Sequence, residues 1–82
     1  MEFVVGGEKI ALEQADVVKR LRGKEPPQHG RQKLFVEVGG RLWPVKACLA
    51  QSTLPALDVA TYPTSEAVRV LKRLGFVITR RG

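Results

Sequence analysis

Two glycine pairs limit how this chain can fold, because each stands where two short apolar runs meet. Gly6-Gly7 separates residues 3–5 from residues 9–11, and Gly39-Gly40 lies within residues 33–45. Paired glycines supply the positive φ values that a tight two-residue hairpin turn requires. The sequence therefore predicts two β-hairpins, a short one near residue 1 and a longer one in the middle of the chain.

The clearest helical pattern follows Pro63. One face with i, i+3, i+4, i+7 spacing is formed by Ala67, Val70, Leu71 and Leu74. Thr64 is expected to cap the start of this helix, and Gly75 is expected to end it. Residues 76–79 then predict a final strand. We expect that strand to pair with the second hairpin, because an unpaired Phe-Val-Ile strand would leave an exposed edge.

An earlier helix is predicted over residues 12–22, where apolar residues have helical spacing and Gly23 follows as the expected C-cap. Its expected inner face comprises Ala11, Ala15, Val18 and Leu21, with Val17 beside it. Its last turn carries three cations that complement the negative end of the helix dipole, namely Lys19, Arg20 and Arg22.

A third helix is predicted over residues 45–51, because Pro44 cannot extend a strand ladder and suits the first turn of a helix. Its inward residues are expected to be Val45, Cys48 and Leu49. Residues 24–32 contain prolines and glycine and predict a loop. Residues 52–62 predict either a loop or a loop with one helical turn.

The predicted order of elements is β-β-α-β-β-α-α-β, an α+β fold with a short antiparallel sheet and two to three helices. Its 82 residues predict one domain over residues 1–82. The single cysteine, Cys48, cannot form an intrachain disulfide, which suits a reducing compartment. Residues 1–10 lack a signal-peptide pattern, and no apolar run approaches the roughly 18 residues of a membrane span. These features predict a cytoplasmic protein.

Catalytic and metal chemistry are not expected. A nucleophile needs a base within hydrogen-bond reach and a third group that orients the base. The only histidine, His29, lies in a predicted loop, whereas Cys48 lies on the expected inner face of a helix. Zinc sites need clustered Cys and His, and the acidic residues here are scattered. We therefore expect a binding protein that is not an enzyme and that uses no cofactor.

The charge balance points to a polyanionic partner. Lysine and arginine number 14 against eight aspartates and glutamates, which gives a formal net charge of +6 and an isoelectric point near 10.1. A basic domain attracts phosphate polymers, anionic membrane surfaces or acidic proteins. The alternative is a small solvated protein that is merely basic.

Three groups of basic residues form the candidate nucleic-acid site. The helix after Pro63 presents Arg69, Lys72 and Arg73 on one face, because they have i, i+3, i+4 spacing. The central hairpin and the helix start after it carry Arg31, Lys33, Arg41 and Lys46. The tail adds Arg80 and Arg81. If the final strand pairs with the hairpin, the second and third groups are expected to converge. The alternative for the helical group is an ordinary solvated helix face.

Trp43 is a candidate for stacking on a base, because it lies between Arg41 and Lys46. The favoured alternative is a core tryptophan, since aromatic side chains dominate the cores of small domains.

The sequence contains an aromatic-Pro-Val-Lys step at residues 43–46 and an A-x-x-x-L-x-R-L-G-F helix end at residues 67–76. These two segments resemble a group of small bacterial domains associated with mobile elements and restriction-type nucleases. The resemblance covers roughly the last fifty residues and implies a DNA-side accessory role, with Lys46, Arg69 and Arg73 as the matching polar positions.

The leading hypothesis is a nucleic-acid-binding module, with double-stranded DNA favoured over RNA, that contacts the phosphate backbone through its basic helix and hairpin. The alternative is a protein-interaction module, with a protein partner or a second copy pairing at an exposed edge strand, at residues 3–5 or 76–79. An outward cluster of Trp43, Tyr62 and Leu57 would favour that alternative.

Overall fold

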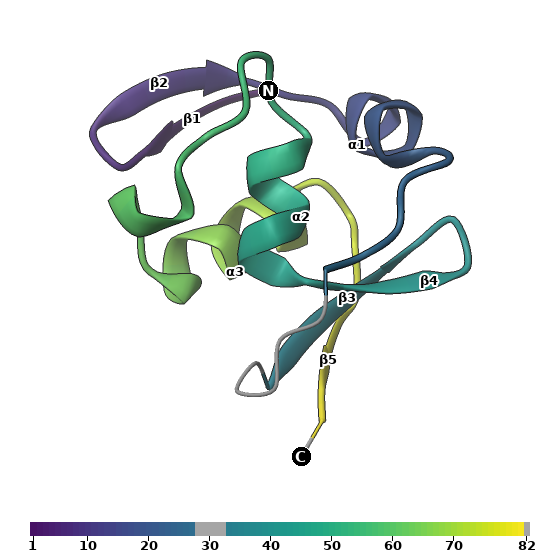
Figure 1. Cartoon of the computed structure of the whole chain (residues 1–82). Helices are drawn as coiled ribbons and strands as arrows, with labels where there is room; N and C mark the ends of the chain where they lie inside the picture. The colour runs from purple at the N-terminus through teal and green to yellow at the C-terminus, as the bar shows by residue number, and fades with distance from the viewer. Residues whose placement is uncertain (28–32, 82) are drawn as a thin grey trace.

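The computed structural model describes residues 1–27 and 33–81 (Figure 1). Its elements are β1 (Glu2–Val5), β2 (Glu8–Ala11), α1 (Gln14–Leu21), β3 (Leu34–Val38), β4 (Arg41–Pro44), α2 (Val45–Gln51), the 3-10 turn η1 (Val59–Thr61), α3 (Thr64–Arg73) and β5 (Ile78–Arg80). This order confirms the predicted β-β-α-β-β-α-α-β arrangement and the α+β class. No described helix has the length and apolar character needed to cross a membrane.

Both predicted hairpins are present, and both turn at their glycine pair. The φ angles are +58° and +82° at Gly6 and Gly7, and +60° and +81° at Gly39 and Gly40. Two successive positive φ values match the tight turn that the right-handed twist of paired strands favours. The β1–β2 hairpin forms a two-stranded sheet of its own, whereas β3 and β4 belong to a second sheet.

The second sheet has three antiparallel strands in the order β4-β3-β5. Pairing of the final strand with the central hairpin, as predicted, is therefore confirmed. However, β5 begins at Ile78 and not at Phe76. The backbone N–H of Phe76 donates to the carbonyl of Leu71 at 3.0 Å, and that of Gly75 donates to Lys72 at 3.0 Å. These two bonds cap the end of α3, so the backbone of Phe76 belongs to the helix terminus and not to the strand.

A single hydrophobic core joins the two sheets and the helices. In Figure 1, α2 lies between the two sheets, with α3 beside it. The apolar face predicted for α3 is buried, as are the inward residues predicted for α2. Across the sheet, Val36 of β3 pairs with Trp43 of β4, and both side chains face the helices as part of this core.

The prediction for the inner face of α1 was right for Leu21, Val18 and the neighbouring Val17, and wrong for Ala11 and Ala15. The helix begins at Gln14, and its buried residues are Val17 and Leu21. Ala15 is exposed, and Ala11 is an exposed residue of β2. Asp16 explains the later start, because its carboxylate accepts a hydrogen bond of 2.9 Å from the backbone N–H of Glu13 and so fixes the first turn.

The connection between α2 and α3 contains one helical turn, η1. Of the two predicted alternatives, this confirms the loop with one helical turn. Asp58 caps this turn by accepting a hydrogen bond of 2.9 Å from the N–H of Ala60. In α3, Thr64 is the first helical residue and not the N-cap, a position that Pro63 occupies. The connection is held against α2 by Thr53, which donates to Ala50 and accepts from Leu57.

Candidate nucleic-acid interface

Opposite charges are segregated along the chain. The region from residue 67 to residue 82 contains five lysines and arginines and no aspartate or glutamate. Six of the eight acidic residues lie in or near the β1–β2 hairpin, at the start of α1, beside η1 or in the first turn of α3, namely Glu2, Glu8, Glu13, Asp16, Asp58 and Glu66. The excess positive charge is therefore concentrated in the last part of the chain, in α3, β5 and the residue after β5.

Few of the charged side chains form ion pairs. Within residues 1–27 and 33–81, the one salt bridge joins the Met1 ammonium to Glu13, and no lysine or arginine side chain lies within 4.0 Å of a carboxylate. Unpaired surface cations are free to neutralise an external anion without first breaking an internal pair.

The basic face of α3 is exposed, as the helical spacing predicts. Arg69, Lys72 and Arg73, which we call the helix face, lie opposite the buried stripe. Arg69 extends toward the first hairpin, where its Nη2 donates to the carbonyl of Val4 at 3.5 Å. The helix face therefore borders the β1–β2 sheet.

Pairing of β3 with β5 brings together part of the second and third basic groups. Leu34 pairs with Arg80, and the N–H of Arg81 donates to the carbonyl of Lys33 at 2.7 Å. Lys33, Arg80 and Arg81, which we call the strand-end cluster, therefore meet at one end of the sheet. Arg31 lies outside the described residues.

Arg41 lies at the opposite end of the β3–β4 hairpin, next to the turn. It pairs with Val38, and its Nη1 donates to the carbonyl of Lys24 at 3.0 Å. The expected convergence of the second and third groups therefore does not include Arg41.

A groove of about 290 Å³ separates the end of α1 from the β3–β4 turn, and Arg41 lines it. Two cations that sequence reasoning had not placed in the site, Arg22 and Lys24, line the same groove. The sequence had indicated only that Arg22 complements the dipole of α1 and that Lys24 belongs to a loop. Their approach to Arg41 depends on the packing of α1 against β3, which no local pattern encodes.

Lys46, the first basic residue of α2, is half-buried and engaged with an aromatic ring. Its Nζ lies 5.6 Å from the centre of the Tyr62 ring, a cation–π distance. The Tyr62 hydroxyl donates to the backbone carbonyl of Lys46 at 2.7 Å. Lys46 is therefore less free to reach a phosphate than the exposed cations are.

Burial removes Trp43 from the candidate stacking residues. Its side chain is 1% exposed and belongs to the core, which agrees with the favoured alternative. Tyr62 is 3% exposed and Leu57 is half-buried, so the apolar cluster that would favour a protein partner does not form on the surface.

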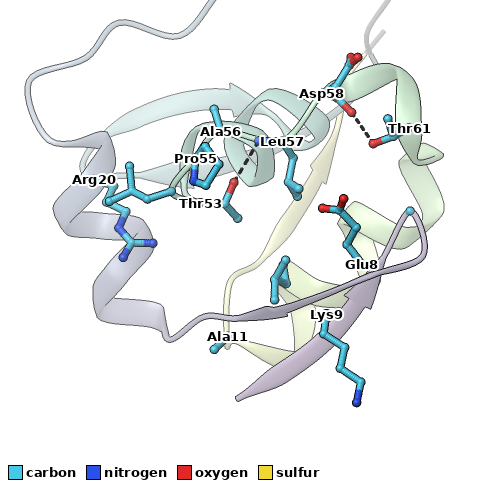
Figure 2. A pocket seen from close by; sticks show the side chains of 13 residues that line it. Glu8, Lys9, Ala11, Arg20, Thr53, Pro55, Ala56, Leu57, Asp58 and Thr61 are labelled. Carbon is cyan, nitrogen blue, oxygen red and sulfur yellow. Dashed lines mark hydrogen bonds between the residues drawn. The ribbon is translucent and has the colours of Figure 1, made fainter.

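A cavity of about 550 Å³ has lining charges of both signs (Figure 2). Glu8 and Asp58 line it together with Lys9 and Arg20. Lys9 points away from the cavity, and the Nη1 of Arg20 donates to the carbonyl of Ser52 at 2.6 Å. Carboxylates in the wall disfavour a phosphate, so this cavity is a weaker candidate than the groove.

The thiol of Cys48 is fully buried, and burial raises its pKa to about 12. A thiol in this environment stays protonated and is a poor nucleophile. His29 lies outside the described residues. The described part of the chain contains no group of three or more side chains suited to holding a metal ion.

No protein-family model, curated protein or solved structure shows a significant match to this chain.

Proposed function

We propose that the chain is a nucleic-acid-binding module that favours duplex DNA over RNA and contacts the phosphate backbone. The observation that carries this proposal is the formal net charge of +6 together with exposed lysines and arginines, none of which forms a salt bridge within residues 1–27 and 33–81. Lysine and arginine gain affinity for DNA by releasing the counterions condensed on it. A surface whose cations are not neutralised internally is suited to that exchange.

Two elements offer rigid contacts. The helix face projects from α3, which packs on α2, β1 and β5, so its three cations have a firm base. The strand-end cluster is held by the pairing of β3 with β5. A helix in the major groove is one geometry that the helix face permits, and backbone contacts along a sheet edge are another.

The proposed role is binding and not catalysis, in a reducing cytoplasmic compartment. A buried, protonated Cys48 fits such a compartment. The resemblance to domains associated with mobile elements and restriction-type nucleases agrees with an accessory role on DNA.

Fluorescence anisotropy with labelled duplex DNA and labelled single-stranded RNA tests the proposal. We expect tighter binding to the duplex, and weaker binding in an Arg69→Ala/Arg73→Ala variant. The matched control is Lys9→Ala/Lys19→Ala, which removes the same charge from exposed positions outside the helix face. Failure of the wild-type protein to bind either polymer at low salt contradicts the proposal. Equal losses in the two variants contradict the role of the helix face.

A protein-interaction role is the second candidate, and one observation favours it. In the described part of the chain, β5 pairs only with β3, so its other edge is open to a further strand. Val77, directly before β5, is 77% exposed. Strand addition at this edge would place a partner strand, or β5 of a second copy, beside Ile78–Arg80. Light scattering over a range of protein concentrations detects the second copy. The N–H of Arg81 donates to Lys33, directly before β3, so the N–H of the adjacent Arg80 faces the open edge, and an Arg80→Pro change should abolish strand addition there.

A further inference from the structure

The groove between α1 and the β3–β4 turn combines two chemistries. Its charged lining residues are Arg22, Lys24 and Arg41, and its floor is formed by Val18, Leu21 and Val38. The three cations come from two parts of the chain, the end of α1 and the start of β4. A ligand that fits this groove has an anionic group beside a compact carbon surface.

Arg41 is held in position before any ligand binds. Its partner Val38 is a core residue, and paired residues lie on the same face of a sheet, so Arg41 is directed toward α1. One of its N–H groups is used by the carbonyl of Lys24. A guanidinium has five N–H donors, so most of them remain for an anion. Positioning the donor in advance reduces the entropy lost on binding.

No carboxylate is among the residues that line the groove in the described structure. Glu37 pairs with Leu42 and alternates with Val36 and Val38, so its side chain lies on the opposite face of the sheet. The Nζ of Lys24 donates to the Oε1 of Gln51 at 3.5 Å, a bond to a neutral amide that leaves its charge in place. The three like charges around one concavity repel one another, and a concave wall of low dielectric constant strengthens their joint potential. An anion in the groove relieves that repulsion.

We propose that this groove binds one backbone phosphate of a nucleic acid, with the attached sugar against the apolar floor. The inference rests on the proposed function and gives it a specific phosphate subsite. Arginine binds phosphate through two parallel hydrogen bonds, which suits the fixed guanidinium of Arg41. A volume of about 290 Å³ is at the small end for ligand pockets and fits one sugar-phosphate unit.

The test compares two pairs of substitutions that remove the same charge. The groove variant is Arg22→Gln/Lys24→Gln, which leaves the Arg41 side chain and its hydrogen bond to the Lys24 backbone in place. The control variant is Lys9→Gln/Lys19→Gln, at exposed positions outside the groove. Circular dichroism and thermal unfolding confirm that both are folded. A triple variant that also carries Arg41→Gln removes the third cation of the groove.

We expect duplex affinity to fall about tenfold further in the groove variant than in the control, as for loss of charge-assisted hydrogen bonds. We also expect the slope of log affinity against log salt to be shallower by about 0.9 than in the control, the value for one lost phosphate contact. In the wild-type protein, duplex DNA should shift the NMR signals of the backbone amides of residues 22–24 and 38–41.

Three results would overturn the inference, each at a different point. Equal losses in the two variants, with unshifted groove amides, reject the subsite and leave nucleic-acid binding standing. A wild-type protein that binds no duplex rejects the proposed function and the subsite together. If inorganic phosphate alone shifts the groove amides of a protein that binds no duplex, the source of the phosphate is a small molecule and the backbone assignment is wrong.

Discussion

The hydroxyl of Tyr62 donates a 2.7 Å hydrogen bond to the backbone carbonyl of Lys46, while the Lys46 ammonium lies 5.6 Å from the centre of the Tyr62 ring. The two residues thus contact each other twice, through the backbone and through the side chains. Tyr62 directly follows η1, and Lys46 lies in the first turn of α2. The pair therefore fastens the α2–α3 connection to the central helix.

Replacing Tyr62 with phenylalanine should lower stability while preserving the packing of the ring. Removing a partly buried hydrogen bond costs about 1 kcal/mol, or roughly 4–8 °C in Tm for a domain of this size. Thermal unfolding of wild type and Tyr62→Phe measures the difference. An unchanged Tm would show that water replaces the hydroxyl at no cost.

Stability should fall as pH rises between about 9 and 12. Burial raises the pKa of Cys48 from 9.0 to about 12, and that of Tyr62 from 10.0 to about 12. Because the folded state holds these protons more tightly than the unfolded state, the stabilisation is complete below the unfolded pKa and is lost as pH approaches the folded pKa. Denaturant unfolding at a series of pH values measures this.

The Cys48→Ala variant separates the two residues in that series. Without the thiol, the decline should begin near pH 10, the ordinary pKa of tyrosine, instead of near pH 9. A decline that starts at the same pH in both proteins would show that Cys48 makes no contribution.

The wild-type thiol should also resist a thiol reagent until the protein is unfolded, since it is fully buried.

Gly6→Ala should destabilise the protein more than Gly39→Ala. Both glycines occupy the first position of a hairpin turn, with φ near +60°, so each alanine costs about 1–2 kcal/mol of backbone strain. A Cβ on Gly6 would also lie 2.6 Å from the carbonyl oxygen of Thr61, whereas one on Gly39 would meet open space. The added overlap should cost a further 1–3 kcal/mol or so.

Denaturant unfolding of these two variants measures the excess directly. The difference between them reports how firmly the first hairpin docks on η1, because the backbone strain is common to both. Equal destabilisation would mean that the hairpin moves away from Thr61 without loss.

Arg20→Ala should destabilise the protein. Arg20 belongs to the basic residues of α1, but its side chain has a structural role. Its Nη1 donates to the carbonyl of Ser52 at 2.6 Å, which links α1 to the end of α2. We expect a loss of about 1.5 kcal/mol, the low end for a hydrogen bond to a charged group, because Arg20 is only partly buried. Lys19→Ala, at the exposed neighbouring position, is the control and should change stability little.

The local parts of the fold could be predicted because short-range patterns determine them. Paired glycines supplied both hairpin turns, and the apolar spacing of Ala67, Val70 and Leu71 identified the buried face of α3. The inner face of α1 could not be chosen this way, since Val17 and Val18 are adjacent and both apolar. Packing against β3 and α2 decides in favour of Val17.

The candidate site was only partly accessible from sequence. Spacing alone placed Arg69, Lys72 and Arg73 on one face, because they belong to a single helix. The groove joins residues from α1 and β4 that lie far apart in sequence, so its existence depends on tertiary packing. Arg22 complements the dipole of α1, and this local role accounts for a cation at the end of a helix. Nothing in the local pattern indicates that Arg22 also lines the groove.

The salt dependence of duplex DNA binding tests the central claim most directly. Affinity of the wild-type protein should be measured by anisotropy over a range of salt concentrations and plotted as log affinity against log salt. The exposed, unpaired cations of the described residues predict a straight line of steep negative slope, about −0.9 for each phosphate neutralised. Absence of binding at low salt, or an affinity that salt barely changes, would contradict the claim that the basic surface binds a nucleic-acid backbone.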